Sequence, residues 1–174
     1  WGDDERFVKS YFTAFKEMVY SSFDWAVRDE DGYFFIMGRT DDVINVAGHR
    51  LGTREIEEAI QNHSAIAEVA VIGVADKLKG QVPVGFARLK DPSQLSAEGA
   101  AEKLEKEVIG KVQEILGAVA KPHRVHFVTA LPKTRSGKIL RKTMRGIADG
   151  RDEPAPSTIE DPAVLEALKD VLQR

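Results

Sequence analysis

Val69-Ala70-Val71-Ile72-Gly73-Val74 is a nearly continuous apolar run rich in β-branched residues. A second apolar run, Val84–Leu89, alternates less cleanly, and the polar stretch Ala75–Gln81 connects the two. Short apolar runs of this kind are typical of strands covered by other elements, whereas half-exposed strands alternate strictly. We therefore predict two central strands, each covered on at least one face.

Helical patterns flank these strands. We expect Thr53 to cap a helix that ends near His63, because several acids in its first turns oppose the positive end of the helix dipole. From Ser96 onward, apolar residues recur at spacings of three and four, which predicts one long amphipathic helix with Gly117 as a weak point near its end. The recurring positions are Leu104, Val108, Val112, Ile115, Leu116 and Val119.

The remaining segments complete an α+β pattern. Val125 and Phe127 share one face of a further strand, and a basic helix is expected over residues 139–147. Tyr33–Met37 and Val43–Val46 read as two strands joined by a charged turn. We predict a small mixed sheet of about three strands plus a two-stranded hairpin, packed with helices.

The two ends of the chain differ in composition from its middle. Residues 149–162 combine three prolines with acidic residues, which predicts an extended linker rather than core, followed by a short helix. The aromatic-rich start, which opens on Trp1, suggests a C-terminal piece of a longer protein. The predicted parts are the end of a preceding domain over residues 1–40, a second domain over 41–148, and an acidic linker with a helix over 149–174.

Composition narrows the classes of function. The chain has 25 Lys and Arg, 28 Asp and Glu, and a net charge of -3, which argues against a general nucleic-acid binder. No run approaches the roughly 20 apolar residues of a membrane span, so we expect a soluble, cytoplasmic protein. The absence of Cys fits this compartment, and the four His residues lack metal-ligand spacing, so no metal site is predicted.

A lysine follows a glycine-hinged loop in Pro132-Lys133-Thr134-Arg135-Ser136-Gly137-Lys138. Gly137 gives the backbone freedom to bring the Lys138 ammonium close to a phosphate or carboxylate. A P-loop is excluded, because Pro132 occupies the position that requires glycine. An interaction module with a basic patch stays open, although the patch lacks the interleaved aromatics that stack on bases. Its members are Lys133, Arg135, Lys138, Arg141, Lys142 and Arg145.

Ninety residues upstream lies Gly38-Arg39-Thr40-Asp41-Asp42-Val43-Ile44-Asn45-Val46-Ala47-Gly48-His49-Arg50-Leu51. The two motifs in this order resemble the acyl-CoA synthetases of the adenylate-forming superfamily. Gly38–Leu51, Lys79-Gly80-Gln81 and Gly150-Arg151-Asp152 resemble the propionate-CoA ligase branch, next to the acetate-CoA ligases. The resemblance covers nearly the whole chain.

This resemblance implies the C-terminal lid domain of a synthetase, preceded by the end of its adenylation domain. The full enzyme would convert propionate, ATP and CoA into propionyl-CoA, AMP and pyrophosphate, with Mg²⁺ accompanying ATP. Acetate is the alternative acid. The fragment alone is expected to be inactive, because its partner, the N-terminal domain, would hold the acyl pocket and most ATP contacts.

The resemblance also assigns roles to particular residues. Lys138 matches the catalytic lysine of adenylation, which in relatives is also a target of protein acyltransferases and deacylases. Asp41 matches the hinge residue about which the lid turns, and only the alignment to an Arg-x-Asp pattern selects it over Asp42. Thus the same domain is expected to serve both half-reactions, adenylation first and thioester formation after rotation.

Further matches concern the nucleotide and CoA. Asp24 resembles the aspartate that binds both ribose hydroxyls, although Trp25 follows it where relatives have glycine. The remaining matches are Arg39 near the ribose, Arg50 near phosphate and CoA, and Ala47 and Gly48 along pantetheine, with Gln113 standing where some acetate-activating relatives place an arginine.

Overall fold

The computed structural model describes residues 2–15, 18–40 and 42–172, apart from the side chain of Met37. The chain divides into two compact units, residues 1–41 and residues 42–174. We call them the N-terminal unit and the main unit, and describe each by itself.

The N-terminal unit holds one helix and a two-stranded sheet. Helix α1 (Asp4–Tyr11) begins after Asp3, whose carboxylate accepts the N–H of Arg6 at 3.0 Å. Strands β1 (Asp24–Arg28) and β2 (Phe34–Arg39) pair antiparallel. Many large apolar side chains of this unit are exposed, as an element that packs against another domain requires. They include Phe7, Phe15, Tyr20, Val27, Phe34, Phe35 and Ile36.

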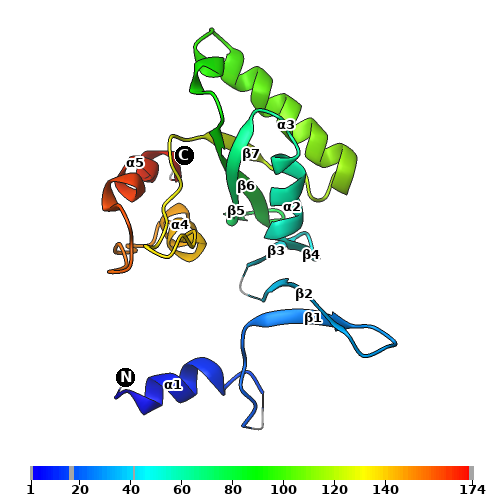
Figure 1. Ribbon diagram of the computed structural model, residues 1–174, viewed down its shortest axis with the longest axis vertical. Coiled ribbons are helices and arrows are strands. Elements are labelled where there is room, and N and C mark those ends of the chain that lie inside the picture. The colour runs from blue at the N-terminus through cyan, green and yellow to red at the C-terminus, as the bar shows by residue number, and fades with distance from the viewer. Residues whose placement is uncertain (1, 16–17, 41, 173–174) are drawn as a thin grey trace. The chain divides into compact units, whose positions relative to one another are not determined.

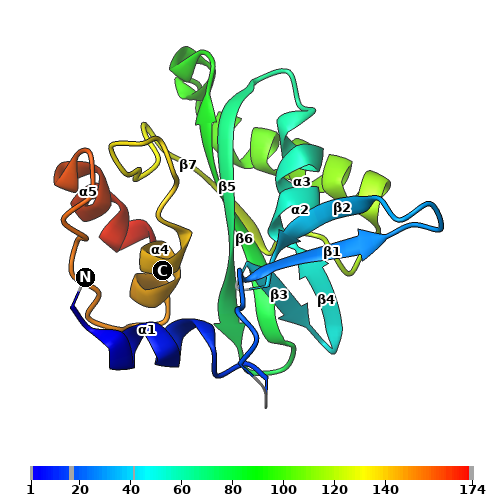
Figure 2. The ribbon, with the colours of Figure 1, turned by 60° about the horizontal axis from the view of Figure 1, so that its bottom comes forward.

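The main unit is built on a mixed five-stranded sheet. Its strands are β3 (Val43–Val46), β4 (His49–Gly52), β5 (Ile66–Asp76), β6 (Gly80–Leu89) and β7 (Arg124–Phe127). Strands β5 and β6 form a long antiparallel ladder, and β7 runs parallel to β6. The β3–β4 hairpin joins the β6 strand at its beginning (Figure 2). This confirms the predicted small mixed sheet with an added hairpin.

The partners in the hairpin differ from the prediction. We expected Tyr33–Met37 to pair with Val43–Val46 across a charged turn, but β2 pairs with β1, and β3 pairs with β4. A two-residue turn at Ala47 and Gly48 connects β3 to β4. Both turn residues have positive φ, of 51° and 89°, which matches the twist of the flanking strands.

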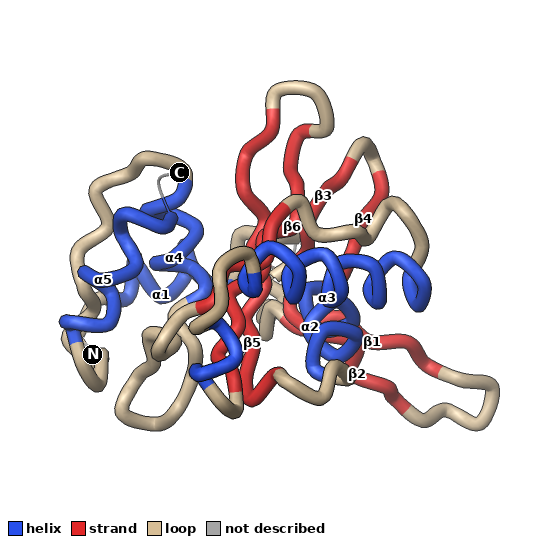
Figure 3. Tube along the Cα trace, turned by 90° about the horizontal axis from the view of Figure 1, so that it is seen from above, coloured by secondary structure: helices blue, strands red, loops and turns tan. Residues whose placement is uncertain are grey.

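Helices cover both faces of the sheet. Helices α2 (Thr53–Gln61) and α3 (Ala100–Leu116) lie on one side, and α4 (Arg141–Ala148) and α5 (Pro162–Leu172) on the other (Figures 1 and 3). A short 3₁₀ turn, η1 (Pro92–Leu95), precedes α3. The main unit is thus a three-layer sandwich with the sheet in the middle.

Side chains alternate between two cores along the long strands β5 and β6, of which β6 is central and β5 lies at the sheet edge. On β5, Val69 and Val71 face α2 and α3, whereas Ala70 and Ile72 face α4 and α5. Each of these four side chains is buried. Because both faces are covered, the strands read as continuous apolar runs, which explains the pattern seen in the sequence.

Three helix ends differ from expectation. Thr53 is the first residue of α2 and is buried, while Gly52 occupies the cap position without a side-chain bond. Helix α3 starts at Ala100 rather than Ser96, after Gly99 with φ 72°. It ends at Leu116, because Gly117 adopts φ 85° and caps the helix, which leaves Val119 outside it and 41% exposed.

The acidic segment after α4 is not wholly outside the core. Ile159 is only 6% exposed and packs in the same apolar cluster as Leu165 and Leu168 of α5. A single isoleucine among prolines and acids forms no periodic pattern, so its burial could not be predicted from the sequence. No helix in the described parts of the chain is both long and apolar enough to cross a membrane.

Candidate functional site

Lys138 stands at the end of a tight loop organised around Thr134. The Thr134 N–H donates to Lys138 O at 2.8 Å, and the Lys138 N–H donates to Thr134 Oγ1 at 3.1 Å. Gly137, with φ 81°, donates its N–H to Thr134 O at 2.8 Å. The Lys138 side chain is exposed, and it forms no ion pair with any residue that the structure describes. The loop therefore fixes the backbone of Lys138 and leaves its ammonium available.

Two ion pairs hold the two legs of this loop to the sheet layer. Lys133 Nζ pairs with Glu68 of β5 on one leg. On the other, Arg141 at the start of α4 donates from Nε and Nη2 to the two carboxylate oxygens of Glu57 on α2, each at 2.9 Å. Glu57 Oε1 also accepts the N–H of Val71 at 2.8 Å. Residues 84 positions apart are joined in this way, which sequence patterns could not reveal.

These ion pairs weaken the basic-patch interpretation. Of the six basic residues in that stretch, Lys133 and Arg141 are paired with glutamates, and Arg145 Nη2 lies 3.6 Å from Asp42 Oδ1. Three cations of the patch are thus occupied within the domain rather than offered to a polyanion. A domain that binds nucleic acid through this surface would keep most of its cations exposed.

Replacing Glu57 with alanine should lower the free energy of unfolding by about 2 to 3 kcal/mol, because the half-buried Arg141 and the Val71 N–H lose their acceptor. Urea unfolding of the 174-residue chain measures this. Glu58→Ala is the matched control. In the described part of the chain Glu58 pairs with Arg54 alone, in an exposed i,i+4 pair, so its loss should cost under about 0.5 kcal/mol. Equal effects of the two substitutions would contradict the stabilising role of the Glu57–Arg141 ion pair.

The β3–β4 hairpin presents the second group of predicted residues. Ala47 and Gly48 form its exposed turn, and Arg50 lies on β4 with its side chain exposed. An added Cβ at Gly48 would meet no heavy atom of the chain within 4 Å. Internal packing therefore does not require glycine at position 48. Its positive φ favours glycine there, and the space above the turn is open.

The turn between β5 and β6 anchors this hairpin. Lys79 O accepts the N–H of Ala47 at 2.7 Å, and Gln81 Oε1 accepts the N–H of Asn45 at 2.8 Å. Asp76 holds the turn itself, because its Oδ1 accepts the N–H of Lys79 at 2.8 Å and that of Leu78 at 2.9 Å. The sequence analysis missed Asp76 and the side chain of Gln81 as supports of the hairpin.

These hydrogen bonds predict a pH-dependent contribution from Asp76. The bond from the Lys79 N–H, followed by that from Leu78, holds the pKa of Asp76 below its ordinary value of 3.8. A carboxyl whose pKa is depressed by folding stabilises the fold above the unfolded pKa and loses this contribution as the pH falls through the folded pKa. Melting temperatures of the parent and Asp76→Ala should therefore differ at pH 7 and converge below pH 3.8. A constant difference would contradict this role.

The hairpin turn also lines a cavity of about 490 Å³. Apolar walls come from Val46, Val82 and Pro83, while positive or titratable groups surround the opening. These groups are His49, Lys79, Lys121 and His123. No acidic residue is among the described residues that line it. Phosphate groups fit such a lining by charge.

The structure brings Asp24 and Arg39 together in the N-terminal unit. They face each other in the β1–β2 ladder, with Arg39 Nη1 at 3.8 Å from Asp24 Oδ1. The ladder shifts register between Trp25 and Ala26. The Arg39 guanidinium also lies 5.7 Å from the ring centroid of Phe23. The two residues predicted to approach the ribose are therefore neighbours.

Asp41, the predicted hinge, lies outside the described residues, although the boundary between the two units falls directly after it. Asp42 belongs to the main unit, where it pairs with Arg145 of α4. Gln113 lies exposed on α3. Among the described residues, neither Asp42 nor Gln113 forms a hydrogen bond or an ion pair with the lysine loop or with the turn at Ala47 and Gly48.

The lysine loop and the hairpin turn are anchored to different parts of the sheet. The hairpin joins β6 at Gly80. The loop is held directly at Glu68 of β5, and through Arg141 at Glu57, which also accepts the N–H of Val71. Glu68 and Val71 pair with Arg88 and Gly85 of β6, so five to eight residues of strand, roughly 16 to 26 Å, separate these anchor points from Gly80. The two groups are therefore anchored at separate positions along the sheet.

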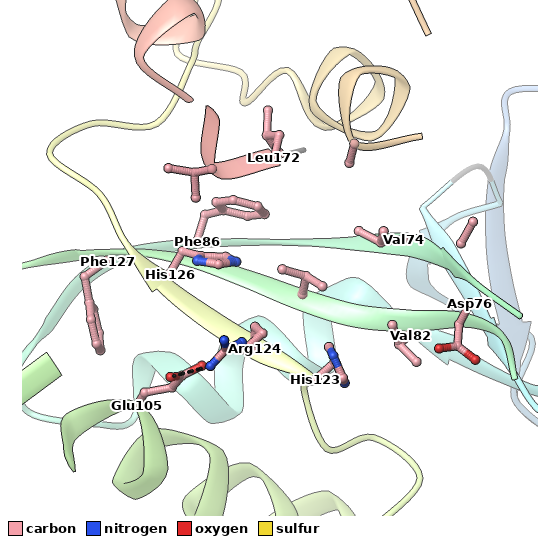
Figure 4. Close-up of a pocket in the computed structure, with 14 residues that line it drawn as sticks. Val74, Asp76, Val82, Phe86, Glu105, His123, Arg124, His126, Phe127 and Leu172 are labelled. Atoms are coloured by element: carbon pink, nitrogen blue, oxygen red, sulfur yellow. Dashed lines mark ion pairs between the residues drawn. The ribbon is translucent and has the colours of Figure 1, made fainter. Parts of the chain in front are cut away.

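A further cavity, of about 590 Å³, lies between the sheet and the end of α5 (Figure 4). His126 stacks on Phe86 at 5.4 Å, and Leu172 contributes an apolar wall. Arg124 at its edge pairs with Glu105 at 3.6 Å. None of the predicted site residues lines this cavity.

Residues 55–138 match the sequence model of a family described as the AMP-binding enzyme C-terminal domain. This segment ends on Lys138 and includes the β5–β6 ladder and α3. Residues 55–138 are therefore similar to the C-terminal domain of the AMP-binding enzymes. The resemblance seen in the sequence is thereby confirmed.

Similar proteins agree with this assignment. The chain is 53% identical to a propionate-CoA ligase of Escherichia coli over 173 residues, which are 99% of this chain and 28% of the ligase. It is 44% identical to an acetyl-coenzyme A synthetase of Pyrobaculum aerophilum over 97% of this chain and 24% of that protein. The chain thus spans about a quarter of the length of these relatives.

Solved structures show the same fold. An anthranilate-CoA ligase, AuaEII, in complex with anthranoyl-AMP superposes with a TM-score of 0.66 at 32% identity, over 84% of this chain and 27% of that one. An ATP-bound chimera of RpMatB and BxBclM gives a TM-score of 0.70 at 28% identity, over 86% of this chain and 28% of that one.

Proposed function

We propose that this chain is the C-terminal lid of an AMP-forming, short-chain acyl-CoA synthetase. The enzyme joins propionate to AMP at the expense of ATP, releasing pyrophosphate, and then transfers the acyl group to CoA, releasing AMP. Mg²⁺ enters with ATP as part of that substrate. The observation that carries the proposal is that the Lys138 loop and the Gly48 hairpin are anchored at separate positions along one sheet.

Lys138 serves the first half-reaction. When a carboxylate attacks the α-phosphate of ATP, negative charge accumulates on the phosphate oxygens, and a positioned cation stabilises the transition state. The exposed Lys138 ammonium, on a loop held by Glu57 and Glu68, fits this role. Its exposure also explains why the chain needs a second domain, because a cation in water stabilises little charge.

The hairpin serves the second half-reaction. Gly48 has no side chain to obstruct a ligand, so the thiol arm of CoA can pass along the turn at Ala47 and Gly48. Lys79 and Lys121 line the adjoining cavity, and no acidic residue is among the described residues of that lining. Together with Arg50 on β4, these cations suit the phosphates of CoA. Gln113 is uncharged, so it cannot attract a phosphate as an arginine would. Arg50 and the cavity lysines are therefore the main attraction for the CoA phosphates on the main unit.

Rotation of the main unit relative to the preceding domain would present the Lys138 loop and the Gly48 hairpin to the active site in turn. Asp41 is the pivot in this proposal, because the unit boundary follows it and because Asp42 is already tied to Arg145. Asp24 and Arg39 bind the ribose from the N-terminal unit, where the carboxylate accepts hydrogen bonds from the hydroxyls. A movement of rigid units about one residue is a common way to present two faces in turn.

Propionate is the proposed acid, because propionate-CoA ligases are 51 to 53% identical to this chain, against 44 to 46% for acetyl-coenzyme A synthetases. The chain alone should release no pyrophosphate, since the acyl pocket would lie in the preceding domain. We place the enzyme in the cytoplasm, where its substrates are found.

A chimera tests the proposal. In this protein, called the ligase chimera, our chain replaces the matching C-terminal segment of the Escherichia coli propionate-CoA ligase. We expect it to form propionyl-CoA from propionate, ATP and CoA, whereas the ligase truncated before that segment should not. A folded chimera no more active than the truncated ligase would refute the assignment. The same assay with acetate in place of propionate tests whether acetate is the preferred acid.

Lys138 is also a candidate for control by protein acyltransferases and deacylases. Acylation would remove the charge that adenylation requires. The side chain is exposed and unpaired among the described residues, so a modifying enzyme could reach it. Incorporation of acetyl-lysine at position 138 of the ligase chimera should abolish adenylation, and unchanged adenylation would refute this control.

A further inference from the structure

The chain beyond α4 returns to the lysine loop and lies along it. Arg135 N donates to Thr158 O at 3.0 Å, and Glu160 N donates to Lys133 O at 2.9 Å. Thr134 and Ile159 form an antiparallel bridge between these two bonds. Residues 158–160 therefore act as a short strand beside the first leg of the loop.

The first leg of the loop is thus paired on both of its edges. On the inner edge Lys133 bridges Ile139, and Leu140 N donates to Pro132 O at 3.0 Å, which closes the loop. On the outer edge it meets residues 158–160. Thr134 is the shared element, because its backbone and hydroxyl contact Lys138 while Ile159 lies opposite it.

The core and α4 hold this segment in place. Ile159 is buried in the cluster formed by Leu131, Ile147 and Leu165. Between α4 and this segment, Arg151 N donates to Gly146 O at 2.9 Å, and a Cβ built on Gly146 would overlap the side chain of Glu153. Close approach of this kind needs glycine on α4. The stretch of residues 151–160 is therefore attached at both of its ends and is part of the folded domain.

We propose that residues 158–160 are a positioning strap for Lys138, so that the C-terminal tail belongs to the adenylation machinery. The proposal rests on the function proposed for Lys138. A cation on a short loop stabilises a transition state only if its backbone is placed within a fraction of an ångström. The strap supplies this restraint through Thr134, while the substrate never touches it. Ile159 is its anchor, and the backbone groups of Thr158 and Glu160 are its contacts.

Glu160→Pro in the ligase chimera tests the strap, because proline removes the N–H that bonds Lys133 O while the exposed side chain contributes little. Glu160→Ala is the matched control, since it keeps the N–H. We expect propionate-dependent ATP-pyrophosphate exchange to fall by about 10-fold in the proline variant. Thioester formation from supplied propionyl-adenylate should stay at the level of the alanine variant. A parallel loss of both half-reactions, or of neither, would overturn the proposal.

Two further measurements separate the possible failures. Lys138→Ala in the same chimera reports on the function itself: if it leaves exchange intact, the function of Lys138 is wrong, whereas if only Glu160→Pro leaves it intact, the strap is wrong. Ile159→Ala, which removes the anchor and keeps every backbone donor, should show the same selective loss and serves if the proline variant does not fold. In the 174-residue chain, the amides of Gly137 and Lys138 should exchange hydrogen faster in Glu160→Pro than in Glu160→Ala, and equal rates would also overturn the strap.

Discussion

Lys138→Ala in the ligase chimera should lower propionate-dependent ATP-pyrophosphate exchange by roughly 10²- to 10³-fold, the range found when one stabilising group for transition-state charge is removed. The side chain is exposed and unpaired among the described residues, so its loss should leave the melting temperature nearly unchanged. Thioester formation from supplied propionyl-adenylate should persist, because that reaction proceeds with the lid turned away.

Lys142→Ala is the matched control for this prediction. Lys142 is also an exposed lysine, four residues further along on α4. If adenylation depended only on the positive potential of this surface, the two substitutions would have similar effects. We expect Lys142→Ala to retain nearly full exchange, and a loss equal to that of Lys138→Ala would contradict a specific role for Lys138.

Gly48→Leu should have the opposite effect. We expect thioester formation from propionyl-adenylate to fall by about 100-fold, because the new side chain occupies the space above the turn where the thiol arm of CoA would lie. ATP-pyrophosphate exchange should persist, since adenylation uses the other end of the sheet. Coupled assays of CoA consumption and pyrophosphate exchange on the ligase chimera measure both.

The strain of the substitution itself requires its own control. Gly48 has φ 89°, which costs any L-residue about 1 to 2 kcal/mol. Gly99 has φ 72°, and a Cβ there likewise meets nothing within 4 Å. Gly99→Leu therefore reproduces the strain without obstructing the hairpin, and should leave both half-reactions intact. If Gly99→Leu lowered thioester formation as much as Gly48→Leu, backbone strain alone would explain the loss.

The sequence predicted those parts of the fold that depend on local patterns. Val69–Val74 and Val84–Leu89 are strands covered on both faces, as their apolar runs predicted, although β5 lies at the edge of the sheet and only β6 is central. Periodicity located α3 within a few residues. The pairing of β1 with β2 and of β3 with β4 was predicted wrongly, because apolar runs do not carry information about partners. Ala47 and Gly48 were predicted to bind a ligand, and the prediction missed that they form the two-residue turn of the β3–β4 hairpin.

The candidate site was predicted less completely. Lys138, Gly48 and Arg50 stood out through motifs, because the residues of each motif are close together in sequence. Their supports did not, because Glu57, Glu68 and Ile159 reach the lysine loop from distant parts of the chain. An acidic residue on an amphipathic helix looks like any solvated charge until folding brings Arg141 beside it.

The most direct test of the account measures both half-reactions in Lys138→Ala and Gly48→Leu versions of the ligase chimera, under identical conditions. If one lid presents two separate groups in turn, Lys138→Ala should lose pyrophosphate exchange and keep thioester formation, and Gly48→Leu should do the reverse. A common loss of both reactions in either folded variant would contradict the account.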